Sequence, residues 1–161
     1  MVDEKYIDNL ISKMTLEEKV GQMQQIAVNM RDKNILQKFI EMGTVGSFLH
    51  VLGNETAQYY EFSEKSNLKI PPIFGIDAVH GHALLKEATI FPSQLALACS
   101  FDDALIENIG YITAKEVAAD GLDWVFSPVL CLGRDLRWGR IDETFGEDWY
   151  LASRLGAAII K

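Results

Sequence analysis

The sequence predicts an α/β protein whose sheet is built from parallel strands. Along its 161 residues, short apolar runs alternate with segments that carry apolar residues at helical spacing. Strands that alternate with helices of this length are joined by right-handed crossovers, which place neighbouring strands parallel. Polar clusters follow two of the expected strands, at the edge where parallel α/β sheets bind ligands. No linker, low-complexity tract or internal repeat interrupts the pattern.

Helices are expected first at the amino terminus. Apolar residues recur at helical spacing over residues 7–14, and Thr15 with Glu18 forms the capping box of a second short helix. A further helix is expected over residues 35–42, where Gly43 ends it.

Three more helices are predicted downstream. One is centred on residues 57–62 and another covers residues 150–160. The longest begins with Asp102 or Asp103 as its N-cap and ends before Gly121, a C′ glycine.

Four strands are expected between these helices. Pro71 and Pro72 fit only the beginning of the third strand, because proline cannot donate to a sheet ladder. The four strands are predicted at Gln24–Val28, Val45–Leu49, Ile73–Asp77 and Trp124–Leu130.

Composition excludes several classes of partner. With 48% hydrophobic residues the chain belongs among globular proteins, and its net charge of −8 argues against nucleic acid and anionic membrane surfaces. No apolar run approaches the roughly 20 residues that span a bilayer. The first residues are acidic where a signal peptide is basic, so we expect a cytoplasmic chain, or a secreted or periplasmic one if trimmed. Cys99 and Cys131 lie in apolar surroundings and are expected to be buried free thiols.

Two polar features lie at the ends of the third and fourth strands. Asp77 ends the third strand and is either a ligand contact or an acid that caps the following loop. The segment 133–148 holds three arginines and five carboxylates around Trp138. One hypothesis is a network of bidentate pairs that fastens the loop; the surplus carboxylates must then accept from helix N-termini or backbone N–H groups. The expected members of this network are Arg134, Asp135, Arg137, Glu143, Glu147 and Asp148.

Four stretches carry a resemblance to a known family: "FGIDAVHG", "FPSQLALACSFD", "FSPVLCLGRDLRWGR" and "ETFGED". They resemble the amino-terminal barrel domain of glycoside hydrolase family three, the β-glucosidase and β-xylosidase branch. The resemblance extends from about Lys5 to Lys161. It implies a (β/α)₈ TIM-type barrel, of which this chain covers roughly the first half, and a hydrolase of carbohydrate metabolism acting on a β-linked oligosaccharide or glycoside.

The resemblance also implies two substrate-binding residues. They are Asp77 of "GIDAVHG" and Arg140, the last arginine of "RWGR". A carboxylate can accept from two vicinal hydroxyls, and a guanidinium donates to others along a fixed fork. Trp138 either stacks on the sugar or supports Arg140 from a buried position.

The histidines leave a metal hypothesis open. His80 and His82 could point to one side of an extended segment and bind a metal, but no third ligand pattern accompanies them, and the family chemistry needs neither metal nor cofactor. His80 is expected to orient the loop after Asp77.

The chain departs from the family pattern in two ways. Leu136 stands where the family usually has proline. The Lys-His pair and the Ser-Asp-Trp type motif with the nucleophile are absent up to Lys161. Retaining glycosidases need two carboxylates about 5–5.5 Å apart. We therefore expect residues 1–161 to be the incomplete amino-terminal part of a barrel domain, without a catalytic residue of its own and inactive alone.

Three further expectations follow. A non-catalytic sugar-binding half-barrel is the alternative function that these residues alone support. A flavodoxin-like phosphate module would need a glycine-rich turn after the first strand, where "VNMRDKN" stands instead. Open barrel edges with unpaired backbone groups predict self-association of the chain.

Overall fold

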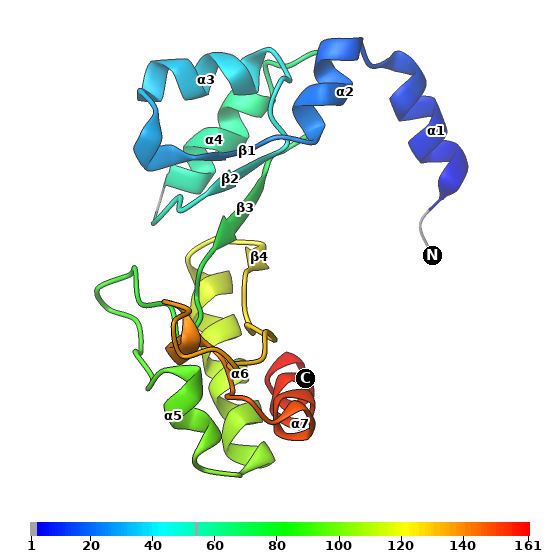
Figure 1. The fold of residues 1–161 in the computed structure, drawn as a ribbon. Helices are drawn as coiled ribbons and strands as arrows, with labels where there is room; N and C mark the ends of the chain where they lie inside the picture. The colour runs from blue at the N-terminus through cyan, green and yellow to red at the C-terminus, as the bar shows by residue number, and fades with distance from the viewer. Residues whose placement is uncertain (1–2, 54) are drawn as a thin grey trace. The chain divides into compact units, whose positions relative to one another are not determined.

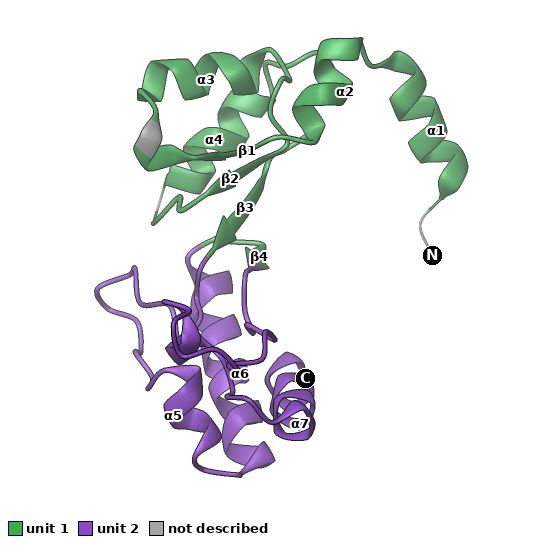
Figure 2. Cartoon of the chain, in the orientation of Figure 1, with its two compact units in different colours: residues 1–76, 121–124 green, residues 77–120, 125–161 purple. Residues whose placement is uncertain are grey.

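A computed structural model describes residues 3–53 and 55–161 and divides the chain into two compact units (Figure 1 and Figure 2). Unit 1 consists of Met1–Ile76 and Gly121–Trp124, and unit 2 of Asp77–Asp120 and Val125–Lys161. The chain thus passes from unit 1 to unit 2 directly after its third strand.

Unit 1 carries the parallel sheet. The strands follow the order β1-β2-β3-β4, with Gln25 opposite Ser47 and Ser47 opposite Ile73 in parallel register. The elements of unit 1 are α1 (Glu4–Lys13), α2 (Leu16–Gln22), β1 (Gln25–Ala27), the 3₁₀ helix η1 (Val28–Met30), α3 (Lys33–Glu41), β2 (Ser47–Leu49), α4 (Glu55–Ser63) and β3 (Ile73–Ile76); β4 (Trp124–Val125) begins in this unit.

Local chemistry sets the helix ends in unit 1. The capping box is confirmed: the Glu18 N–H donates to Thr15 Oγ1 at 3.2 Å, and the Thr15 N–H donates to Glu18 Oε2 at 2.8 Å. Helix α3 begins earlier than predicted because Asp32 accepts from the Asn34 N–H at 2.8 Å. Gly43 ends it in the left-handed region, at φ 68°, as expected.

Aromatic side chains form the core of unit 1. Phe48, Tyr59 and Phe74 are at most 1% exposed. Their ring centroids lie 5.1 to 6.3 Å apart, close enough for edge and offset contacts. Asp123 fastens the end of the unit to β3, since its backbone N–H donates to Phe74 O and its carboxylate accepts from the Phe74 N–H, both at 3.0 Å.

Unit 2 is helical and holds the candidate site. Asp102 accepts from the Ala104 and Leu105 N–H groups and caps its longest helix, while Asp148 caps the last helix by accepting from the Leu151 N–H at 2.7 Å. Gly121 follows the longest helix at φ 79°, as predicted for a C′ glycine. The elements are α5 (Gln94–Ala98), α6 (Asp103–Ala119), the 3₁₀ helix η2 (Ile141–Glu143) and α7 (Trp149–Ile160).

Helices α6 and α7 pack closely against one another in unit 2 (Figure 1). A Cβ on Gly110 would lie 2.3 Å from Ile159 O, so this approach requires glycine. The buried cluster between the helices consists of Leu97, Ala98, Ile106, Ile109, Phe145, Ala152, Leu155 and Ala158.

The structure differs from the sequence prediction at the fourth strand and at α5. The fourth strand covers Trp124–Val125 rather than Trp124–Leu130; Pro128 cannot donate to a ladder, and beyond it only an isolated bridge from Val129 to Thr144 forms. The short helix α5 was not predicted, because five residues are too few for a clear period.

The cysteines are free, as predicted, but both Cys99 and Cys131 are exposed rather than buried. Cys99 is the C-cap of α5, and Cys131 follows Leu130, itself 55% exposed, beyond the end of β4. In the part of the chain that the structure describes, no helix is both long and apolar enough to cross a membrane.

Candidate functional site

A polar cavity of about 200 Å³ in unit 2 contains Asp77. Three segments form it: the chain directly after β3, the beginning of α5, and η2. Its volume corresponds to roughly six waters at about 30 Å³ each, so it can hold a small polar ligand. The lining residues are Asp77, Val79, His80, Ser93, Gln94, Asp142 and Glu143.

The first wall is the loop of residues 77–91, called here the site loop. Its two limbs pair: the Phe91 N–H donates to His80 O at 2.8 Å, and His80 Nδ1 donates to Phe91 O at 3.0 Å, since a carbonyl oxygen only accepts. Gly81 has φ 94°, and a Cβ there would lie 2.1 Å from Thr89 O. Only glycine allows the limbs to approach this closely. His80 thus orients the loop after Asp77, as expected from the sequence.

The second wall depends on Gln94, which is fully buried at the beginning of α5. Its Oε1 accepts from the Val129 N–H at 3.2 Å, and its Nε2 donates to Ser127 Oγ at 3.4 Å. Gln94 therefore ties α5 to the segment that follows β4. Sequence reasoning missed this residue, and its only signal was a polar side chain within the "FPSQLALA" stretch.

The third wall includes Glu143, which forms a bidentate ion pair with Arg140; Arg140 itself is outside the lining, and its side chain is 61% exposed. Arg140 Nε donates to both Glu143 carboxylate oxygens at 3.0 Å, and Nη2 donates to Oε2 at 2.5 Å. The hydrogen bonds from Arg140 hold the pKa of Glu143 below its ordinary value, and the charge of Arg140 contributes in the same direction. Glu143 in turn raises the pKa of Arg140, with a smaller contribution from the charge of Asp77. Glu143 therefore connects Arg140 to the cavity that Asp77 and His80 also line.

The predicted arginine and carboxylate network divides into local pairs. Besides Arg140 and Glu143, Arg137 donates to both oxygens of Asp135, with Nη2 to Oδ2 at 2.6 Å, while its side chain stays 90% exposed. Exposed pairs of this kind contribute little to stability. The expectation that surplus acids accept from helix N-termini is confirmed by Asp148, the N-cap of α7.

Other members of the same segment do not meet in one place. Arg134 and Glu147 are exposed, and Leu136 is 89% exposed. Trp138 is half-buried. Stacking on the sugar requires an exposed ring and support of Arg140 a buried one, so its burial is intermediate between the two roles.

The two histidines of the metal hypothesis bind different partners. His80 pairs with Phe91 O, whereas His82 is fully buried with its Nε2 3.0 Å from Asp120 Oδ2. Among residues 3–53 and 55–161, no group of three or more histidine, cysteine or acidic side chains is placed to hold a metal ion.

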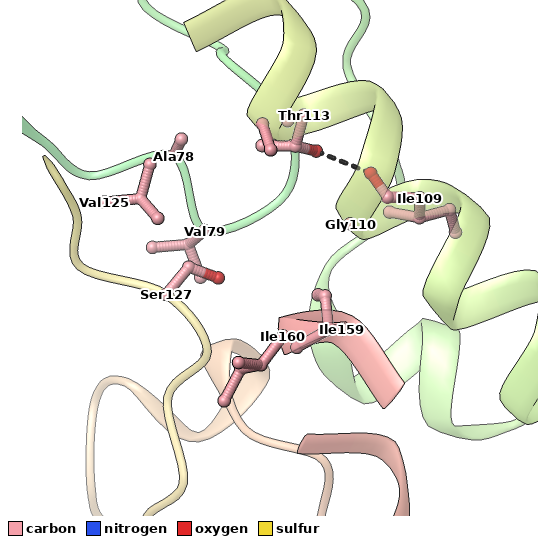
Figure 3. Close-up of a pocket in the computed structure, with 11 residues that line it drawn as sticks. Ala78, Val79, Ile109, Gly110, Thr113, Val125, Ser127, Ile159 and Ile160 are labelled. Atoms are coloured by element: carbon pink, nitrogen blue, oxygen red, sulfur yellow. Dashed lines mark hydrogen bonds between the residues drawn. The ribbon is translucent and has the colours of Figure 1, made fainter. Parts of the chain in front are cut away.

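A second cavity in unit 2, also of about 200 Å³, is apolar (Figure 3). Ile109 and Gly110 of α6 and Ile159 and Ile160 of α7 line it, and the Thr113 hydroxyl that borders it is already bonded to Ile109 O at 2.9 Å. This lining offers no acid, base or charged group to a polar ligand.

Comparison with known proteins gives a consistent result. The family model described as the N-terminal domain of glycosyl hydrolase family 3 matches residues 15–161. The chain is 36% identical over 159 residues to the periplasmic beta-glucosidase of Salmonella typhimurium, covering 97% of this chain and 20% of that protein. It is 35% identical over 182 residues to the lysosomal beta glucosidase of Dictyostelium discoideum, covering 97% of this chain and 22% of that protein.

Solved structures give the same result. A β-glucosidase of intestinal bacteria involved in saponin metabolism is 46% identical, with a TM-score of 0.81, and the match covers 96% of this chain and 20% of that one. A mutant β-glucosidase of Listeria innocua in complex with laminaribiose is 33% identical, with a TM-score of 0.83 over 99% of this chain and 23% of that one.

These matches confirm the α/β fold of the TIM-barrel type. The chain spans about a fifth of the length of the curated relatives it matches. The two relatives are named for different compartments, so they assign none to this chain.

Proposed function

The chain belongs to glycosyl hydrolase family 3, and from this membership we propose that its polar cavity is the part of a β-glycoside hydrolase site that binds the terminal sugar. Residues 1–161 would serve as the amino-terminal part of a glycoside hydrolase barrel domain. The relatives are named β-glucosidases and β-xylosidases, and solved β-glucosidase structures contain glucose or laminaribiose. The proposed substrate class is therefore a β-linked glucoside or xyloside.

The observation that carries this proposal is that Asp77 and Glu143 line one cavity and that Glu143 binds Arg140 through a bidentate ion pair. Asp77 accepts from two neighbouring sugar hydroxyls, and Arg140 donates to others from a guanidinium whose orientation Glu143 fixes. The terminal sugar is a neutral ligand with many hydroxyls, which suits a cavity lined mainly by carboxylates and other polar side chains.

Glu143 is unsuited to the acid/base role of a retaining mechanism. A general acid must keep its proton near neutral pH, whereas the hydrogen bonds from Arg140 hold the pKa of Glu143 below its ordinary value. Both of its oxygens are also engaged by Arg140, which reduces its use as a nucleophile. We propose that other carboxylates cleave the bond, by retention through a covalent glycosyl-enzyme.

We expect the 161-residue chain to bind glucose without hydrolysing a nitrophenyl β-glucoside, because its cavity positions the sugar and we propose that carboxylates outside the cavity cleave the bond. Calorimetry and nitrophenol release on one preparation test both parts. Binding without turnover also fits the second candidate function, a non-catalytic sugar-binding module. Turnover that disappears in Glu143→Gln would overturn the assignment of Glu143, and turnover that persists there would place the catalytic carboxylates elsewhere in the chain.

We also propose that the isolated chain self-associates. Strand β1 lies at one edge of the sheet, and edge strands present unpaired backbone groups. Unit 1 exposes large apolar side chains as well: Met23 is 81% exposed, Ile73 49% and Trp124 45%. Sedimentation of the purified chain should show dimers or larger species, and a monomer over a wide concentration range would contradict this.

A further inference from the structure

The site loop is fastened to the end of α6 by two carboxylates. Glu116 accepts from the Thr89 N–H at 2.9 Å and from the Thr89 hydroxyl at 2.8 Å. Asp120, four residues later, lies 3.0 Å from His82 Nε2. These four residues are called here the α6 clamp. Thr89 and His82 lie on opposite limbs of the loop, so the clamp holds both limbs against one helical turn.

The placement of these two acids is unfavourable for the helix itself. The C-terminal end of a helix carries partial negative charge and disfavours anions. Carboxylates four residues apart on a helix also repel one another, and α6 has no basic residue in its last turn. Local rules of this kind are broken chiefly where another contact depends on the residue. Here that contact is the one that Glu116 and Asp120 make with the site loop.

His82 is the buried half of the clamp. Its side chain is fully buried, and that of Asp120 is 6% exposed. Since a carboxylate only accepts, His82 Nε2 donates the bond. Within the described residues, His82 Nδ1 has no hydrogen-bond partner, so the bond to Asp120 is the polar contact that fixes the ring.

Short contacts connect the clamp to the cavity. Gly81 forms a bridge with Ile90, next to His82 and Thr89, and one residue further the limbs pair again between His80 and Phe91. His80 lines the cavity beside Asp77. We propose that His82 and Asp120 are positioning residues that hold Asp77 and His80 in place for the sugar, an inference that rests on the function proposed above.

Two measurements on the full 161-residue chain test this inference: amide hydrogen exchange and glucose affinity by calorimetry. In Asp120→Ala, we expect the site-loop amides of Leu85 and Phe91 to exchange on the order of tenfold faster and glucose to bind on the order of tenfold more weakly, because small displacements of binding groups are costly. The Leu155 amide in α7 should keep its protection.

Asp120→Asn keeps a carbonyl oxygen that accepts from His82 Nε2, and it should restore both properties. Glu107→Ala is the matched control, since Glu107 is also on α6 but pairs with Lys161 Nζ at 3.7 Å. His82→Leu removes the same bond from its other end, so it should also speed exchange and weaken glucose binding, and the double variant should lose less than the sum of the two single losses. If His82→Leu fails to fold, the exchange rates and glucose affinities of Asp120→Ala and Asp120→Asn test the inference.

Unchanged exchange in Asp120→Ala would overturn the clamp. Faster exchange with unchanged glucose affinity would also overturn the inference, because the contact would then support the loop without positioning the site. Absence of glucose binding by the wild-type chain would contradict the proposed function instead, and the exchange result would then decide the clamp on its own.

Discussion

Replacing Arg140 or Asp77 by alanine is expected to cost about 3–6 kcal/mol of transition-state stabilisation in an enzyme that contains this segment together with its catalytic carboxylates. Hydrogen bonds to charged groups contribute about 1.5–3 kcal/mol each, and each side chain should make at least two to the terminal sugar. The loss corresponds to roughly 10²- to 10⁴-fold in kcat/KM. The measurement is turnover of an aryl β-glucoside by each variant.

Two controls separate sugar contact from loop structure. Arg140→Lys keeps the charge but loses the planar fork that pairs with Glu143, so it should recover only part of the activity. Arg137 lies in the same segment, but its side chain is 90% exposed and bound to Asp135. The turnover of Arg137→Ala should therefore stay close to the wild-type value. Turnover near the wild-type value in Asp77→Ala or Arg140→Ala would contradict the assignment.

The position of Asp77 could be predicted because it depends on a general rule. The third strand was recognisable from its apolar residues and the prolines before it, and chain order then puts Asp77 at a ligand-binding strand end. The caps at Thr15 and Asp102 were equally predictable, since each depends on residues within one turn.

Contacts between distant residues could not be predicted in the same way. Three arginines and five acids in one segment allow many pairings, and only the backbone of η2 selects Arg140 with Glu143. Gln94 finds its partners 33 and 35 residues away. The apolar run that contains Pro128 had the composition of a strand, but the strand ends at Val125.

Replacing Phe145 by alanine is expected to destabilise the chain by about 3–5 kcal/mol, the range found for large aromatic side chains in cores. Phe145 is 1% exposed and packs in the cluster of unit 2 with Leu155 of α7 and Ile106 of α6, both fully buried. It follows η2 by two residues, so its ring holds the segment that carries Glu143 against the helices. Domains are stable by only about 5–15 kcal/mol, so the change removes a large share of the total.

Urea unfolding of wild type and variant, followed by circular dichroism, measures this difference in the free energy of unfolding. Leu136→Ala is the control from the same segment: Leu136 is 89% exposed, and its truncation should change the free energy of unfolding by less than about 0.5 kcal/mol. Phe145→Leu should lie between the two, since it keeps an apolar side chain and leaves a smaller cavity. A loss below about 1 kcal/mol in Phe145→Ala would show that the cluster closes over the missing ring, and that Glu143 does not depend on the core of unit 2 for its position.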